Sequence, residues 1–171
     1  DNRYLLEVNG RYDGSSRFPS DERWAFFPSA SVGWRISQEP WWNVKSEHIS
    51  NTKVRFSWGS LGNAAGLSNY QYIQTLGISK SDYILDGLRQ NYMSSPAALP
   101  GNLTWETATT YDIGVDLGFF DNRLTVSGDY YIRKTTDMIV NGPTVPDVFG
   151  ASSPKGNYAD MSTYGYELSL E

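Results

Sequence analysis

Three aspartates form the clearest chemical grouping that the sequence predicts. Asp112 and Asp116 lie in one stretch of alternating polar and apolar residues, and Asp129 lies in the next. If these stretches pair so that Asp129 faces Gly114, the other two carboxylates flank it diagonally at roughly 7 Å. Such spacing suits a bound cation or the two carboxyl groups of an inverting glycosidase. The alternative is an ordinary polar sheet face, which we favour because no apolar pocket is predicted that would raise a carboxyl pKa.

A second candidate set is aromatic and lies between residues 64 and 105, where no periodicity persists. Its members are Tyr70, Tyr72, Tyr83, Tyr92 and Trp105. Their flat apolar faces could stack on sugar rings, and the alternative is packing within the loop itself. A loop of this length is usually functional. Within it, residues 82–91 are compatible with a short helix.

Motifs for catalysis or cofactor binding are missing from the sequence. His48 is the only histidine, and it has no second ligand or nucleophile beside it. No phosphate-binding loop, dinucleotide fingerprint or nucleophile elbow is present. Cysteine is absent, which excludes disulfides and thiolate metal sites. The sequence therefore predicts neither an enzyme nor a cofactor.

The aspartates are positioned by a β-hairpin that the pattern predicts over residues 111–134. Apolar and polar residues alternate with period two on both sides of Asp121 and Asn122, which tolerate the positive φ of a tight turn. The register then pairs Phe119 with Leu124, Leu117 with Val126, Ile113 with Tyr130, and Gly114 with Asp129. A slip of one residue would mix the two faces, so pattern and turn chemistry favour the same pairing.

The same alternation predicts strands at residues 6–12, 24–36, 53–59 and 164–170, and residues 135–140 extend the hairpin. Pro28 predicts a bulge or an edge position in the second of these. The longer connections, at residues 13, 64 and 142, fall at one end of the sheet. The tight turn and a medium linker over residues 38–50 fall at the other. We expect an all-β protein, an antiparallel up-and-down meander of about six strands.

Composition leaves two environments open for the apolar face of this sheet. Aromatic residues make up 15% of the 171 residues and charged residues only 19%, which suits many half-exposed strands in one domain. A net charge of −5, without a basic stripe, argues against nucleic acid as a partner. No apolar run reaches the ~20 residues of a transmembrane helix. The face either lies in a soluble core or contacts lipid in a barrel.

Several short motifs resemble the barrel region of SusC/RagA-type TonB-dependent transporters. They include residues 27–37 (FPSASVGWRIS), 53–59 (KVRFSWG), 116–120 (DLGFF) and 135–139 (TTDMI), followed by Gly165-Tyr166-Glu167. The resemblance covers nearly the whole chain except residues 64–102. It implies a large transmembrane β-barrel of Bacteroidetes-type bacteria, located in the cell outer membrane, that imports glycans or peptides.

The resemblance also implies partners and orientation. A SusD-like surface lipoprotein would cover the barrel, and TonB would supply energy through an N-terminal region that this chain does not show. Lipid would contact the Leu117/Tyr130 face, and Asp112, Asp116 and Asp129 would face the lumen. Because the plug domain is also missing, we expect residues 1–171 to be a partial barrel domain that needs the rest of the barrel and plug. The alternative is a soluble β-sandwich that binds carbohydrate, and an enzyme ranks third.

Overall fold

The computed structural model describes residues 2–42, 48–94, 96, 98–101, 103–151 and 153–171. Six strands form one antiparallel sheet in the order β1-β2-β3-β6-β7-β8, so each pairs with the next strand of this sheet, and β4 and β5 are inserted between β3 and β6. Their bounds are β1 (Tyr4–Gly14), β2 (Trp24–Arg35), β3 (Ile49–Asn63), β6 (Glu106–Phe119), β7 (Leu124–Asn141) and β8 (Lys155–Leu170). The predicted six-stranded meander is confirmed.

Helical structure in the described residues is limited to two short 3-10 turns, η1 (Ile36–Gln38) and η2 (Asp147–Phe149). No helix in these ranges has the length and apolar character needed to cross a membrane.

The predicted hairpin has the predicted register. Phe119 pairs with Leu124, Ile113 with Tyr130, and Gly114 with Asp129. Asp121 and Asn122 have φ values of 60° and 61°, the left-handed region that a tight turn requires. The turn residues and the alternation of apolar with polar residues therefore determine how the two strands of this hairpin pair.

The prediction of a short helix at residues 82–91 is wrong. This segment instead belongs to a separate hairpin made of β4 (Ile78–Leu85) and β5 (Leu88–Met93). Asp86 and Gly87 form its turn with φ values of 53° and 75°. An Asp-Gly pair is a strong signal for a two-residue hairpin turn, and positive φ at both positions is incompatible with a helix.

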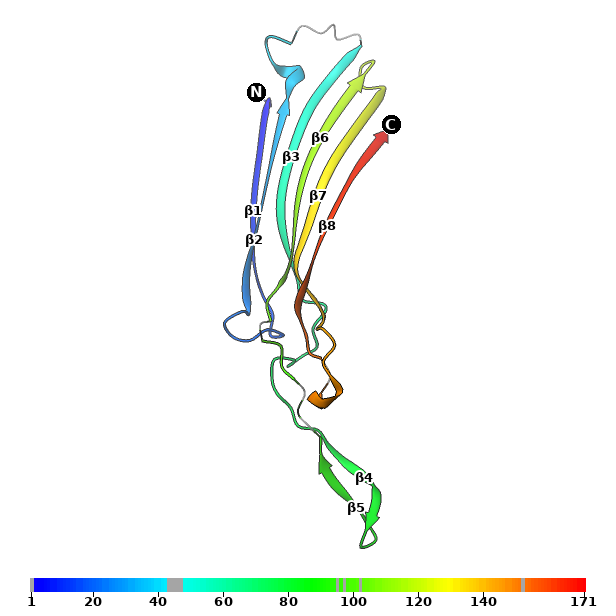
Figure 1. The fold of residues 1–171 in the computed structure, drawn as a ribbon. Coiled ribbons are helices and arrows are strands. Elements are labelled where there is room, and N and C mark those ends of the chain that lie inside the picture. The colour runs from blue at the N-terminus through cyan, green and yellow to red at the C-terminus, as the bar shows by residue number, and fades with distance from the viewer. Residues whose placement is uncertain (1, 43–47, 95, 97, 102, 152) are drawn as a thin grey trace.

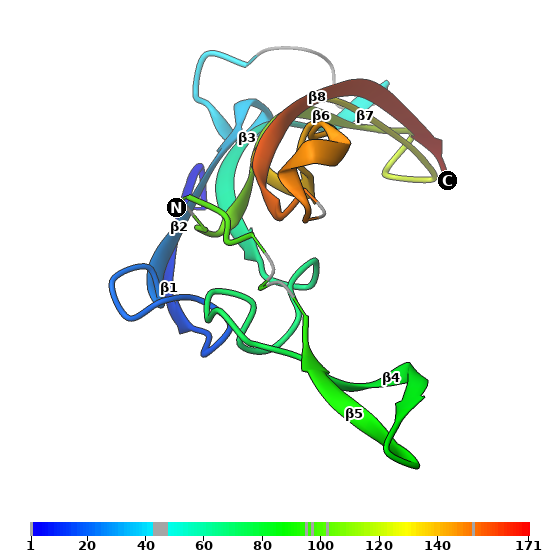
Figure 2. The ribbon, with the colours of Figure 1, turned by 60° about the horizontal axis from the view of Figure 1, so that its bottom comes forward.

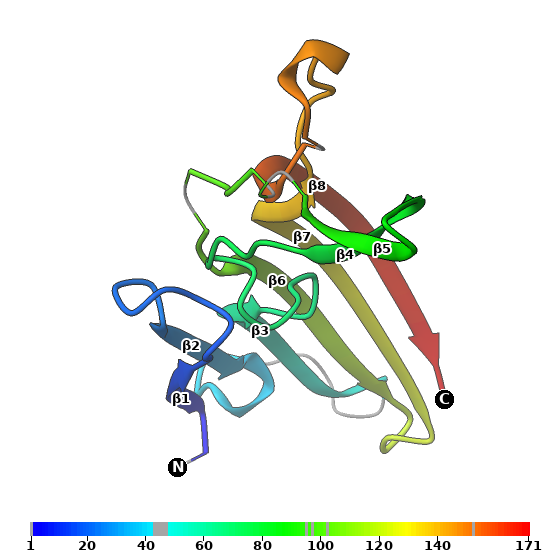
Figure 3. The ribbon, with the colours of Figure 1, turned by 90° about the horizontal axis from the view of Figure 1, so that it is seen from below.

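The sheet is long and curved, and its connections differ between the two ends (Figure 1). The connections β1–β2, β3–β6 and β7–β8 lie at one end, and β4–β5 projects beyond them. The β6–β7 turn, the β2–β3 connection and both chain termini lie at the other end. Figures 2 and 3 show the strands following an arc from β1 to β8. We refer to these as the long-loop end and the short-turn end.

The buried core lies at the long-loop end rather than between two sheets. Among the described residues, the buried apolar side chains are Phe18, Phe27, Leu67, Leu103 and Trp105, which form one cluster. Loop residues thus pack against the ends of the strands. Neither face of the six-stranded sheet is covered by a second sheet.

Pro28 lies where the pairing of β2 becomes one-sided. It still opposes Gly10 of β1, but the pairing of β2 with β3 begins only at the next residue, Ser29. The edge position predicted for Pro28 is therefore confirmed, because β2 has no partner on its β3 side at this residue. The pairing of β1 with β2 continues past Pro28 without a bulge.

Candidate functional site

The polar face of the sheet is centred on Arg55 of β3. Its Nε donates to Asp116 Oδ2 at 2.8 Å, and its Nη2 donates to Asp116 Oδ1 and Asp129 Oδ1, each at 2.9 Å. Lys53 Nζ lies 3.8 Å from Asp116 Oδ2. One guanidinium therefore links three neighbouring strands, β3, β6 and β7, in a bidentate geometry that lysine cannot provide.

Gly114 makes this cross-strand link possible. It pairs with Arg55 on one side and with Asp129 on the other, so the guanidinium must pass directly over it. A Cβ atom at this position would overlap Asp129 Oδ1 and lie 2.9 Å from Arg55 Cζ. Because Gly114 has no side chain, Arg55 of β3 can reach across β6 to Asp129 of β7.

The structure places Asp112, Asp116 and Asp129 on the same face, as the register predicted. Asp116 and Asp129 share Arg55, and Lys53 also lies near Asp116, so two basic side chains accompany these two carboxylates. No group of three or more potential metal ligands exists among the described residues. The ion pairs of Arg55 with Asp116 and Asp129 are the pattern expected of an ordinary polar sheet face. Arg55 itself was not among the predicted site residues, because its position opposite Gly114 depends on pairing across the connection 64–105.

The aromatic set is dispersed rather than gathered into one site. Trp105 is buried: its ring lies 4.8 Å from Phe18 and 5.6 Å from Phe27, and its indole N–H donates to Glu22 O at 3.1 Å. Tyr72 packs against the same cluster. For these two residues the structure matches the alternative of packing within the loop. The remaining tyrosines, Tyr70, Tyr83 and Tyr92, are exposed, and the last two belong to the β4–β5 hairpin. His48 is also exposed.

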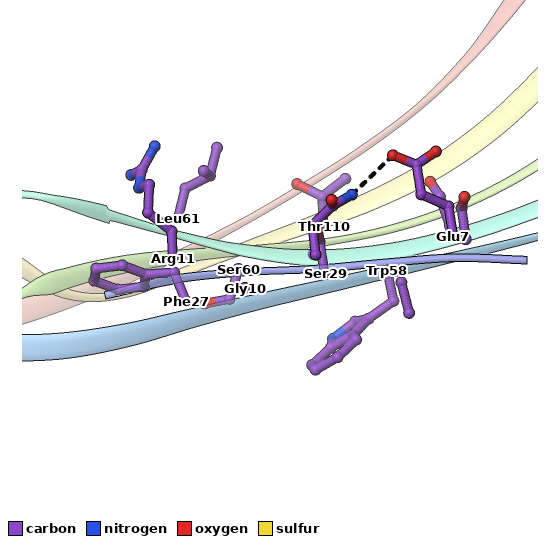
Figure 4. Close-up of a pocket in the computed structure, with 14 residues that line it drawn as sticks. Glu7, Gly10, Arg11, Phe27, Ser29, Trp58, Ser60, Leu61 and Thr110 are labelled. Atoms are coloured by element: carbon purple, nitrogen blue, oxygen red, sulfur yellow. Dashed lines mark hydrogen bonds between the residues drawn. The ribbon is translucent and has the colours of Figure 1, made fainter. Parts of the chain in front are cut away.

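A hollow of about 650 Å³ lies on the polar face over β1, β2 and β3. Figure 4 shows Glu7, Arg11 and Leu61 rising from the strands around it, with Ser29 between them and Phe27 at one side. Small residues form much of the floor, including Ser57 and Gly59. The lining therefore combines serine and threonine hydroxyl groups with the charged side chains of Glu7 and Arg11, and it also includes Phe27 and Trp58.

A polar cluster around Glu39 fixes the short-turn end. The Glu39 carboxylate accepts hydrogen bonds from Tyr4 Oη at 2.6 Å and Trp34 Nε1 at 3.0 Å, and Arg3 Nη1 lies 3.6 Å away. The hydrogen bond from Tyr4, then that from Trp34, holds the pKa of Glu39 below its ordinary range, although desolvation opposes them. Trp41 packs 6.3 Å from Trp34, so aromatic rings gather at this end.

The apolar face is continuous across all six strands and is exposed. Cross-strand pairing aligns Leu6, Val32, Phe56, Ile113, Tyr130 and Tyr166 in one row. Each of these side chains is between 47% and 86% exposed. Water is an unfavourable environment for a contiguous patch of this kind, so the face requires an apolar partner.

Comparison with known proteins gives consistent matches over the whole chain. A family model described as TonB dependent receptor-like, beta-barrel matches residues 1–171. The TonB-dependent receptor SusC of Bacteroides thetaiotaomicron is 36% identical over 174 residues, which is 99% of this chain and 17% of SusC. The TonB-dependent receptor P3 of Formosa agariphila is 36% identical over 169 residues, or 98% of this chain and 16% of P3.

Solved structures agree with these sequence matches. The RagAB peptide importer in its closed-closed state aligns with a TM-score of 0.82 and 28% identity, over 99% of this chain and 18% of that chain. The open-open state gives a TM-score of 0.81 and 29% identity with the same coverage. These matches confirm the resemblance that the motifs indicated, and the chain spans less than a fifth of the length of these relatives.

Proposed function

Because the chain belongs to the TonB-dependent receptor-like β-barrel family, we propose that it forms a section of the barrel wall of an outer-membrane transporter. The transporter takes up glycans or peptides. Transport rather than catalysis is the role of this section, and the missing part of the polypeptide supplies the plug and the segment that contacts TonB. A SusD-like surface lipoprotein is the expected lid.

The observation that carries this proposal is the uncovered apolar face. Six strands present one row of exposed apolar side chains, while Arg55, Asp116 and Asp129 satisfy one another on the opposite face. Alternation of apolar-outward and polar-inward residues is the pattern of a membrane barrel whose lumen is wet. The apolar face then contacts lipid, and the three aspartates face the lumen.

Aromatic residues at both ends of β1 support the same orientation. Tyr4 lies beside Trp34 at the short-turn end, and Tyr12 stacks on Trp24 at the long-loop end with ring centroids 5.3 Å apart. The eight residue steps from Tyr4 to Tyr12 span roughly 26 Å along a strand. A tilt of about 40° reduces this to ~20 Å, close to the ~25 Å apolar band of such barrels.

Sheet edges explain why the rest of the barrel is required. β1 and β8 each have one unpaired edge within this sheet. Unpaired backbone groups are strongly unfavourable in lipid, so a membrane sheet must close on itself. The long loops then lie outside the cell and the short turns face the periplasm, as in other barrels of this architecture.

Fractionation of the source cells tests the proposal directly. An antibody raised against this segment should detect a protein far larger than the segment in the outer-membrane fraction. Its electrophoretic mobility should shift on heating, as folded barrels do. A soluble antigen of about the size of the segment would refute the proposal and favour a soluble carbohydrate-binding module. Uptake of labelled glycans and peptides by a strain lacking the gene then identifies the substrate class.

A further inference from the structure

Residues 36–42, which follow β2, fold back onto the apolar face of the sheet. Tyr4 lies two residues before Leu6 of that face, and Trp34 is its partner in β2. Both side chains donate to the Glu39 carboxylate, at 2.6 Å from Tyr4 Oη and 3.0 Å from Trp34 Nε1. Glu39 therefore lies on the apolar side of the sheet. Figure 1 shows η1, at the beginning of this segment, beside the start of β1 at the short-turn end.

The same segment, which we call the 36–42 loop, lies against the start of β3. Ser37 Oγ donates to Asn51 Oδ1 at 3.2 Å. The next residue, Thr52, shares the apolar face with Val54. Thr52 is only 7% exposed, whereas the row of apolar side chains that begins at Leu6 is at least 47% exposed. One end of the apolar face is therefore covered by the protein's own chain.

Trp41 lies on the outer surface of the 36–42 loop. Its ring centroid lies 6.3 Å from that of Trp34 and 6.2 Å from that of Trp42, yet its side chain is 60% exposed. The charge of Glu39 is buried beneath it, with Arg3 Nη1 3.6 Å from the carboxylate. The loop thus buries its acidic group and exposes a large ring. Tryptophan is the side chain typical of a membrane–water interface, because its ring is apolar and its N–H is polar.

We propose that the 36–42 loop binds the headgroup region of the periplasmic lipid leaflet, with Trp41 at the level of the glycerol esters and Glu39 as the residue that positions it. This inference rests on the proposed barrel wall and adds a lipid-binding element to it. Continuity with the apolar face identifies lipid as the occupant, because Trp41 packs on Trp34, and Trp34 pairs with Val54 in the same row of that face.

The charges of the loop indicate which lipids it accepts. Among its described residues, Glu39 is the one acidic side chain, and Arg3 lies beside it. The pair has no net charge, so it does not select anionic headgroups. A neutral phospholipid such as phosphatidylcholine is therefore sufficient to test the proposal.

Fluorescence quenching in the full-length transporter, reconstituted in phosphatidylcholine vesicles, measures the depth of position 41. Residues 1–171 contain no cysteine. Trp41→Cys is labelled with bimane in a protein whose other cysteines are replaced by serine. The vesicles carry a nitroxide on the fifth or on the twelfth acyl carbon. The shallow nitroxide should quench the label about twofold more than the deep one. Stronger quenching by the deep nitroxide, or quenching by neither, overturns the proposal.

Two further label positions calibrate this measurement. Ile113→Cys lies in the exposed row of the apolar face and should be quenched more by the deep nitroxide. Ser57→Cys lies on the polar face and should be quenched by neither. A label at position 41 that behaves like the label at position 57 is covered by water or by another part of the protein, and this result refutes the lipid contact.

Two variants at Glu39 test its positioning role. Glu39→Ala removes the acceptor that Tyr4 and Trp34 share, whereas Glu39→Gln keeps an oxygen that accepts both hydrogen bonds. With the label at position 41, the alanine variant should lose most of the roughly twofold preference for the shallow nitroxide, and the glutamine variant should retain it. An unchanged preference in the alanine variant overturns the role of Glu39. A heat-shifted mobility shows that both variants fold.

Failure of this inference differs from failure of the barrel wall. A heat-modifiable barrel in which lipid nitroxides quench position 113 but not position 41 refutes the loop contact and leaves the proposed transport function intact. A protein in which position 113 is also unquenched does not present its apolar face to lipid. That second result refutes the proposed function itself.

Discussion

Replacement of Gly114 by alanine should lower the free energy of unfolding by disturbing one contact, the ion pair between Arg55 and Asp129. The new Cβ would occupy the path between Arg55 and Asp129, which now meet at 2.9 Å. A charge-assisted hydrogen bond contributes about 1.5–3 kcal/mol where it is well buried. These side chains are 33% and 21% exposed, so solvent screening reduces the contribution to about 1 kcal/mol.

Gly128→Ala is the matched control. This glycine lies in β7, and the nearest atom to its added Cβ is Leu168 Cδ1 at 4.0 Å. Alanine stabilises a site that accepts it by about 0.4–1 kcal/mol, because the unfolded chain loses freedom. The free energy of unfolding should therefore fall by about 0.5 kcal/mol for Gly114→Ala and rise by a similar amount for Gly128→Ala.

Urea unfolding of the full-length transporter in lipid vesicles, followed by tryptophan fluorescence, measures this difference of about 1 kcal/mol. Asp129→Asn completes the test, because it weakens the same contact. In that background Gly114→Ala should no longer destabilise the protein, as two changes to one contact are not additive. Equal stability of the two alanine variants, or additive effects with Asp129→Asn, would refute the role assigned to Gly114.

Three further outcomes follow from other parts of the structure. The hydrogen bond from Tyr4 lowers the pKa of Glu39, so ionised Glu39 stabilises the folded protein fully above the ordinary glutamate pKa. This stabilisation is lost as the pH falls through the lowered pKa. Glu39→Gln should therefore make the free energy of unfolding depend less on acid pH, which urea unfolding at a series of pH values measures. Trp105→Ala removes a buried ring, worth about 3–5 kcal/mol, and should expose the connection 64–105 to trypsin while the barrel stays heat-modifiable. Val115→Arg, on the apolar face, should destabilise the barrel in vesicles by about 2–4 kcal/mol, whereas Ser57→Arg on the opposite face should change it little; equal effects would contradict the assigned faces.

Local patterns determined much of the fold. Asp121 and Asn122 fix a tight turn, and alternation on both sides then permits only one register, which the structure has. The strands, their order and the two chemically different faces follow from similar short-range signals. The error at residues 82–91 is also local: the Asp86-Gly87 turn was present in the sequence and marks a hairpin rather than a helix.

Contacts across long connections could not be predicted in this way. Loop closure over residues 64–105 leaves the register of β3 against β6 free, so the position of Arg55 opposite Gly114 depends on pairing that only the folded sheet specifies. Burial of Trp105 has the same origin, because its neighbours Phe18 and Phe27 lie far away in sequence.

By itself, the sequence determined the six strands of the main sheet, the hairpin at residues 111–134 and the separation of polar from apolar residues, because each depends on neighbours within a few positions. The tertiary structure decided which carboxylates share a guanidinium, which aromatic side chain is buried and where the pairing of β2 with β3 ends. Pro28 shows both levels at once. The residue alone predicts a missing donor, but only the arrangement of β1, β2 and β3 determines that the missing donor faces β3, where the pairing of the two strands ends.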